Sequence, residues 1–200
     1  MKKRLVSNNK KRSFPVFWIF LTGFIAGVFL PNLVWKLEWR QKTISSLYLI
    51  STFAGRTGDD GRYLWQVLRM RGSFYLLAAF SGVSVFGAPL AVVTLFVCGF
   101  QTGAVLAVSV LQFGLQGGVA GASLFFPQHL IYFPCLFYLM SKIYGQSLEI
   151  WKNRGLFPRK VSDYVLGVLI CGLAYTGGIL LEVFLNPKIV ETVMGSLKIF

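Results

Sequence analysis

A long stretch without formal charge constrains this chain more than any other feature. From Phe74 to Met140 the sequence contains no Lys, Arg, Asp or Glu. A soluble helical bundle carries charged residues on its outer faces, whereas the core of a lipid bilayer excludes them. At about 20 residues for each crossing of a ~30 Å hydrocarbon core, this stretch predicts three transmembrane helices joined by tight turns.

Two further apolar runs flank this stretch and complete the predicted fold. Hydrophobic residues make up 55% of the chain and charged residues only 14%, against roughly 25% charged in soluble domains. We therefore expect an all-α, polytopic membrane helical bundle of about five transmembrane helices, with kinks at Pro89 and Pro134 because proline lacks an amide donor. The expected spans cover residues 14–34, 74–97, 100–118, 123–143 and 164–184.

The distribution of basic residues predicts the orientation of the bundle. Residues 1–13 form a basic tail, and residues 142–160 are again rich in Lys and Arg. Because basic segments stay on the cytoplasmic side, five spans place both segments inside. Residues 14–200 then form a single membrane domain in the cell membrane. We expect the first span to be an uncleaved anchor, because its run is long and lacks a small-residue cleavage site.

The first outer loop, residues 36–72, is the most polar part of the expected membrane domain. It carries seven basic and three acidic residues around the loop signal TGDDG at 57–61. Residues 44–53 and 63–70 are suited to short amphipathic helices, which either lie along the membrane surface or pack against the bundle. The chain's net charge of +13 is attributed to topology and anionic lipid, and no nucleic-acid partner is expected.

Glycines four residues apart recur in the expected spans. Small residues at this spacing let membrane helices approach closely, so they predict helix packing. The sequence leaves open whether these contacts lie within one chain, between copies in a homo-oligomer, or with another partner. The predicted packing positions are Gly23 with Gly27, Gly99 with Gly103, and Gly114 with Gly118.

Few residues are candidates for chemistry. His129 is the single histidine, and Glu182 is the one acidic residue deep in the last apolar run. Together they suit a proton relay or an ion site, or a single polar contact between helices. The sequence has no metalloprotease, serine-hydrolase or nucleotide-binding motif, and its three cysteines form no CxxC pair. We therefore predict no enzyme activity, no metal and no cofactor.

The order of these segments resembles the stage II sporulation protein M family. The resemblance covers most of the chain, and its most telling stretches are FGAPL at residues 86–90 and FPQHLIYFP at residues 126–134. It implies a five-span membrane scaffold on the mother-cell side of the sporulation septum. Such a scaffold recruits two peptidoglycan hydrolases, stage II sporulation proteins P and D, which thin the septal wall for engulfment.

A recruiting protein needs an exposed binding surface, and the outer loop is the expected one. Trp, Tyr and Arg dominate binding hot spots, so we predict partner contacts at Arg62, Tyr63, Trp65 and Arg69. Contacts through the glycine pairs are the competing route. A different class of function, a small membrane transporter or permease component, is the alternative, although no inverted repeat is visible and few polar groups could line a path.

Overall fold

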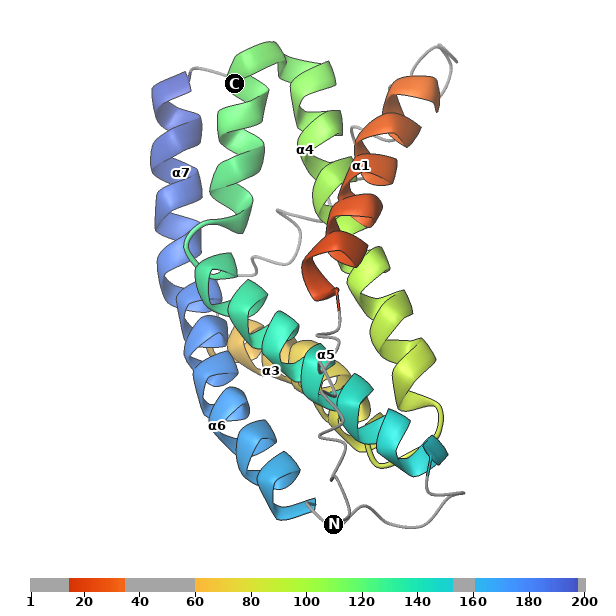
Figure 1. Ribbon diagram of the computed structural model, residues 1–200. Helices are drawn as coiled ribbons and strands as arrows, with labels where there is room; N and C mark the ends of the chain where they lie inside the picture. Colours follow the sequence, from red (N-terminus) through yellow and green to blue (C-terminus); the bar gives the residue numbers. More distant parts are fainter. Residues whose placement is uncertain (1–14, 35–59, 153–160, 198–200) are drawn as a thin grey trace, which may run out of the picture.

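The computed structural model describes residues 15–34, 60–152 and 161–197. The described residues are helical apart from short turns and form one elongated bundle (Figure 1). The expected helix at residues 44–53 lies outside this part of the chain. The elements are α1 (Val16–Val34), α3 (Asp60–Ser81), α4 (Gly87–Phe125), α5 (His129–Lys152), α6 (Val161–Leu180), η1 (Leu181–Leu185) and α7 (Asn186–Leu197).

The helices confirm an all-α fold with membrane-spanning character. Among the described residues, three segments are long and apolar enough to cross a bilayer: Val16–Leu33, Gly87–Leu111 and Val161–Val190. A fourth candidate combines Gly114–Phe125 with His129–Lys152, two helices bent by 63° at their junction. Three or four helices of the described chain are therefore suited to a membrane by length and composition.

The expected span 74–97 is not one helix. Residues 74–81 end α3, a turn follows, and α4 begins at Gly87. The Ser84 hydroxyl donates to the Ser81 carbonyl in this turn, and the Ser147 hydroxyl accepts the Ala88 amide at 2.9 Å. Pro89 accordingly lies in the first turn of α4, where its missing amide costs nothing, and not at a kink within a span.

Gly114 divides the next expected span, 100–118. Its backbone (φ 65°, ψ −149°) is one that only glycine adopts readily. Here α4 reverses direction (Figure 1), and residues after the reversal pack against residues before it. A Cβ added at Gly121 would lie 2.8 Å from Ser109 Oγ. The expected span 123–143 is also interrupted, because Phe126–Gln128 separate α4 from α5, and Pro134 lies within α5.

The glycines of α1 and of the first part of α4 bring these two helices into backbone contact. A Cβ added at Gly23 or Gly27 would overlap the carbonyl oxygens of Phe96 and Phe100 in α4. Conversely, Cβ atoms added at Gly99 and Gly103 would overlap carbonyl oxygens of α1, those of Phe20 and Phe24. Residue numbers rise together along both helices, so α1 and this part of α4 are parallel. Gly114 and Gly118 lie elsewhere, in the reversal of α4.

α3 runs antiparallel along α6. Three pairs of neighbours mark this contact: Val67 shares a cluster with Ile179, Tyr75 lies beside Gly172, and Gly82 lies beside Tyr164. The described part of the expected outer loop, residues 60–72, is therefore neither a loop nor a separate short helix. It is the first half of a 22-residue helix, because Val67, Tyr75 and Ala78 continue one buried face across the expected boundary.

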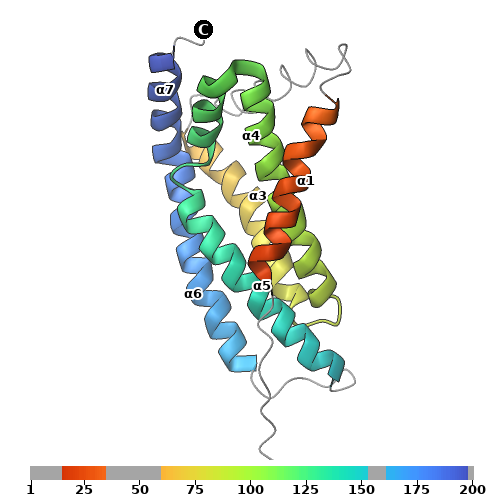
Figure 2. The ribbon, with the colours of Figure 1, turned by 45° about the horizontal axis from the view of Figure 1, so that its top comes forward.

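The core lies where α3, α4, α5 and α6 meet. It is built from buried residues of all four helices, including Tyr75, Leu95, Met140 and Cys171. The outward faces are apolar too: Leu166, for example, is 60% exposed on α6. Figure 2 shows α6, η1 and α7 as one long rod along the side of the bundle. A bundle that is apolar both inside and outside is suited to lipid.

Candidate functional site

A polar cavity of about 520 Å³ lies among the helices. α3, α4, α5, α6, η1 and α7 each contribute to its wall. The polar or ionisable residues of the wall are Tyr63, Arg71, Cys98, Gln101, Thr102, Gln128, His129, Tyr132, Tyr175, Glu182 and Asn186. Because this volume falls in the range of ligand pockets, ~300–1,000 Å³, the cavity is the candidate functional site.

An ion pair crosses the wall of the cavity. Arg71 Nη2 of α3 donates to Glu182 Oε1 of η1 at 2.9 Å. The Tyr132 hydroxyl of α5 donates to the other carboxylate oxygen, Glu182 Oε2, at 2.7 Å. The guanidinium carbon of Arg71 also lies 5.5 Å from the centre of the Tyr132 ring, which is cation–π distance. This cluster holds together three segments that are far apart in the sequence.

A single π-helical turn places Glu182 in this cluster. η1, Leu181–Leu185, inserts between α6 and α7 without breaking the rod. Such π-helical turns occur frequently at functional sites, because the wider turn redirects side chains. Directly after it, Asn186 Nδ2 donates to the carbonyls of Ser123 and Phe126 at 2.9 and 2.8 Å. Asn186 therefore fixes the interrupted span against the rod.

Gln128 and His129 form the wall at that interruption. Gln128 is 2% exposed, and its Nε2 donates to the Leu124 carbonyl. Its Oε1 is buried and has no hydrogen-bond partner among the described residues. His129 Nδ1 lies 3.0 Å from the Phe125 carbonyl, which can only accept, so Nδ1 carries the proton. In the neutral tautomer with this proton, Nε2 is an acceptor.

The sequence pointed to part of this site. His129 and Glu182 both line the cavity, although no hydrogen bond joins them, and Glu182 makes a polar contact between helices, one of the alternatives that the sequence left open. Arg71 was missed because it was assigned to the outer loop. Its spacing gives a signal: it lies four residues after Val67 and four before Tyr75, both buried, so all three share one face of a helix.

The expected partner-binding residues separate into two groups on α3. Arg62, Trp65 and Arg69 are exposed, and Trp65 is exposed by 67%. They lie three, four and seven residues apart, which places them on one face of the helix, hereafter the α3 stripe. Tyr63 is half-buried, packs against the cluster of Val67 and lines the cavity.

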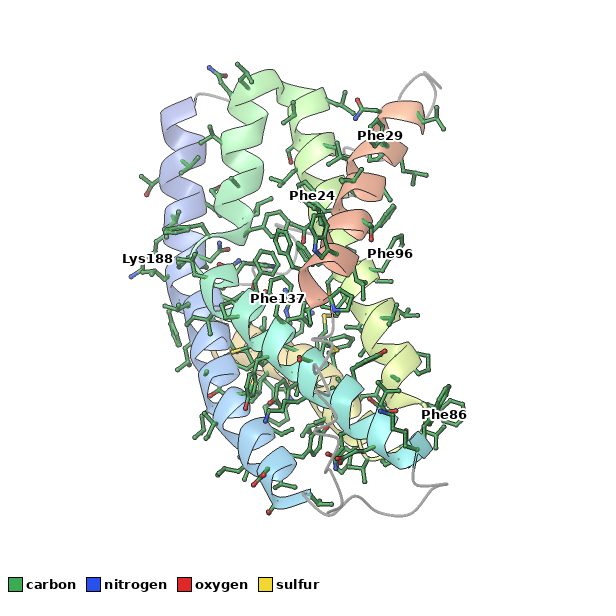
Figure 3. The ribbon with its side chains drawn as sticks, in the orientation of Figure 1. Phe24, Phe29, Phe86, Phe96, Phe137 and Lys188 are labelled. Atoms are coloured by element: carbon green, nitrogen blue, oxygen red, sulfur yellow. The ribbon has the colours of Figure 1, made fainter. Side chains whose placement is uncertain are left out.

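Ring contacts complete the wall on the side of α5. His129 makes edge-to-face contacts with Phe125, Tyr132 and Phe133. Phe20 of α1 contacts Phe133 and Phe137 in the same way, and Phe137 is labelled beside α1 in Figure 3. Aromatic rings therefore join α1 to the helix that carries the polar wall.

The geometry defines two candidate surfaces, the polar cavity and the exposed α3 stripe. Within the described parts of the chain, no three His, Cys, Asp or Glu side chains are placed to hold a metal ion. No family model, curated protein or solved structure matches the chain, so both surfaces are interpreted from their own chemistry.

Proposed function

We propose that this chain is a five-crossing membrane scaffold of the stage II sporulation protein M type. In this role it recruits the peptidoglycan hydrolases that thin the septal wall, stage II sporulation proteins P and D, and performs no hydrolysis itself. It acts in the mother-cell membrane at the sporulation septum. The resemblance of the sequence and two features of the helix arrangement support this proposal.

The first feature is the direction of the helices. α1 and the first part of α4 are parallel, so a chain that crosses the bilayer with both must return once between residues 34 and 87. α3 lies in that interval and runs antiparallel along α6. We assign α3 as the returning crossing, although its arginines exclude it from the apolar candidates. The proposed crossings are then five: α1, α3, the first part of α4, the bent pair of the end of α4 with α5, and the rod of α6, η1 and α7. They place the basic segments 1–13 and 142–160 on the cytoplasmic side.

The second feature, which carries the proposal, is the α3 stripe. Arg69 exposes a cationic side chain near the middle of α3, a helix that packs along a membrane-spanning one. An arginine facing hydrocarbon costs about 2.5–3.5 kcal/mol near the centre of a transmembrane helix. A partner helix with polar or acidic groups would offset this cost. Trp65, four residues before Arg69, supplies the large apolar contact that binding hot spots favour.

Recruitment is tested by changing the α3 stripe and following the two hydrolases. In Arg69→Glu and in Trp65→Ala, we expect co-purification of the hydrolases with the scaffold to fall at least about tenfold, as for a hot spot worth over 1 kcal/mol. Lys188→Glu is the matched control, because Lys188 is an exposed cation on α7 (Figure 3) and is not part of the α3 stripe. If both stripe variants insert normally and recruit normally, the scaffold proposal fails.

The cavity favours a second candidate, a small membrane transporter. Arg71, Glu182 and Tyr132 place charged and polar groups inside a bundle of membrane helices, where such groups often mark a solute path. A flux assay in liposomes separates the two functions. Transport of a solute or of protons by the purified protein, abolished in Glu182→Gln, would favour the transporter, and an impermeable vesicle would exclude it.

A further inference from the structure

Arg71 has hydrogen-bonding capacity that its ion pair does not use. A guanidinium carries five N–H donors, and among the described residues Glu182 accepts from Nη2. The Arg71 side chain is 40% exposed, whereas that of Glu182 is 13% exposed. Both carboxylate oxygens of Glu182 are already engaged, one by Arg71 and one by Tyr132. This wall of the cavity therefore offers unused donors and suits an anionic group.

The wall formed by Gln128 and His129 offers the opposite chemistry. Gln128 Oε1 is a buried acceptor without a partner among the described residues, and its amide cannot be reversed, because Nε2 must donate to the Leu124 carbonyl. His129 adds a second acceptor, Nε2. Leaving a buried acceptor without a hydrogen bond lowers the stability of the fold by about as much as losing a hydrogen bond does. This wall therefore favours an N–H or O–H donor.

We infer that the cavity binds a small amphoteric group, with an anionic end at Arg71 and an amino or hydroxyl end at Gln128 and His129. The Arg71–Glu182 pair leaves the site neutral, which disfavours a simple ion of either sign. The Tyr132 ring joins the two ends, since its centre lies 5.5 Å from the Arg71 guanidinium carbon and 5.6 Å from the centre of the His129 ring. This inference goes beyond the scaffold proposal and does not depend on it.

Two sources supply this chemistry in a cell. One is a water-soluble molecule that joins a carboxylate or phosphate to an amine. The other is the headgroup of an aminophospholipid, which joins a phosphate diester to a primary ammonium. Phosphatidylethanolamine and phosphatidylcholine separate donor recognition from charge, because both are zwitterionic but the choline headgroup has no N–H donor.

The test is native mass spectrometry of the full chain with defined lipids. Released from detergent, the protein should retain phosphatidylethanolamine at least about tenfold more than phosphatidylcholine, as expected when one donor–acceptor pair is satisfied or left unmade. A second arm adds free phosphoethanolamine. If free phosphoethanolamine displaces the bound lipid, the ligand is a water-soluble molecule of this class. If the lipid stays bound in its presence, the ligand is the lipid headgroup. Equal retention of the two lipids, with no binding of free phosphoethanolamine, overturns the inference.

Matched variants localise the site. Gln128→Leu should remove the preference for the ethanolamine headgroup, and Gln146→Leu should keep it, because Gln146 is also a buried glutamine with one unpaired amide atom, Nε2, but does not line the cavity. His129→Phe preserves the ring contacts and removes the second acceptor, so it serves if Gln128→Leu fails to fold. A preference that survives in the folded acceptor variants would place binding elsewhere and refute the site.

Discussion

The backbone contact between α1 and α4 predicts opposite effects for glycine-to-alanine changes at different positions. At Gly23 or Gly27 an added Cβ would overlap a carbonyl oxygen of α4, so the two helices must separate. Overpacking of this kind costs roughly 1–3 kcal/mol. At Gly145 and Gly177 an added Cβ meets no atom within 4 Å. There, alanine gains its helix propensity, about 0.8–1 kcal/mol relative to glycine.

The unfolding of purified variants in detergent measures both effects. We expect Gly23→Ala and Gly27→Ala to lower the free energy of unfolding by up to about 2 kcal/mol net, because the propensity gain offsets part of the overpacking cost. Gly145→Ala and Gly177→Ala should raise it by up to about 1 kcal/mol. The two pairs together provide an internal control for the general effect of a methyl group. Equal stabilisation of all four variants would refute the close approach of α1 to α4.

Three further predictions follow from single contacts. Gly114→Ala should destabilise the protein by about 1–3 kcal/mol, because alanine is strained at φ 65°, and thermal unfolding in detergent measures the loss. In a double-mutant cycle, Arg71→Met and Glu182→Gln should each destabilise the protein and show a coupling energy of about 0.5–2 kcal/mol, whereas additive effects would contradict the ion pair. Asn186→Leu should cost about 1–3 kcal/mol by freeing the Ser123 and Phe126 carbonyls, and should increase protease cleavage near residue 126; unchanged cleavage would contradict its role.

The sequence predicts the helical class of this fold well and its helix boundaries poorly. The first apolar run becomes α1 almost as expected, because a long apolar run has few alternatives in lipid. The boundary at Gly72 was wrong, because charge was used to separate loop from span. Arg71 remains in the bundle through a partner 111 residues away, and no local pattern predicts a pairing over that distance.

The sequence predicts two residues of the candidate site but not their contacts. A lone His129 and a lone Glu182 in apolar runs mark intramembrane positions of interest from sequence alone. Their partners depend on how α5 and the rod of α6, η1 and α7 pack together. The π-helical turn that aims Glu182 at Tyr132 has no sequence signature, so the geometry of the cluster could not be anticipated.

The long separation of Arg71 from Glu182 has a consequence for biogenesis. During synthesis α3 leaves the ribosome well before η1 exists, so its arginine meets the translocon without its counter-charge. Integration of an unpaired arginine is unfavourable by about 2.5–3.5 kcal/mol. If α3 is the returning crossing proposed above, its stable integration awaits η1, and truncation before residue 182 should leave α3 outside the bilayer while α1 remains inserted.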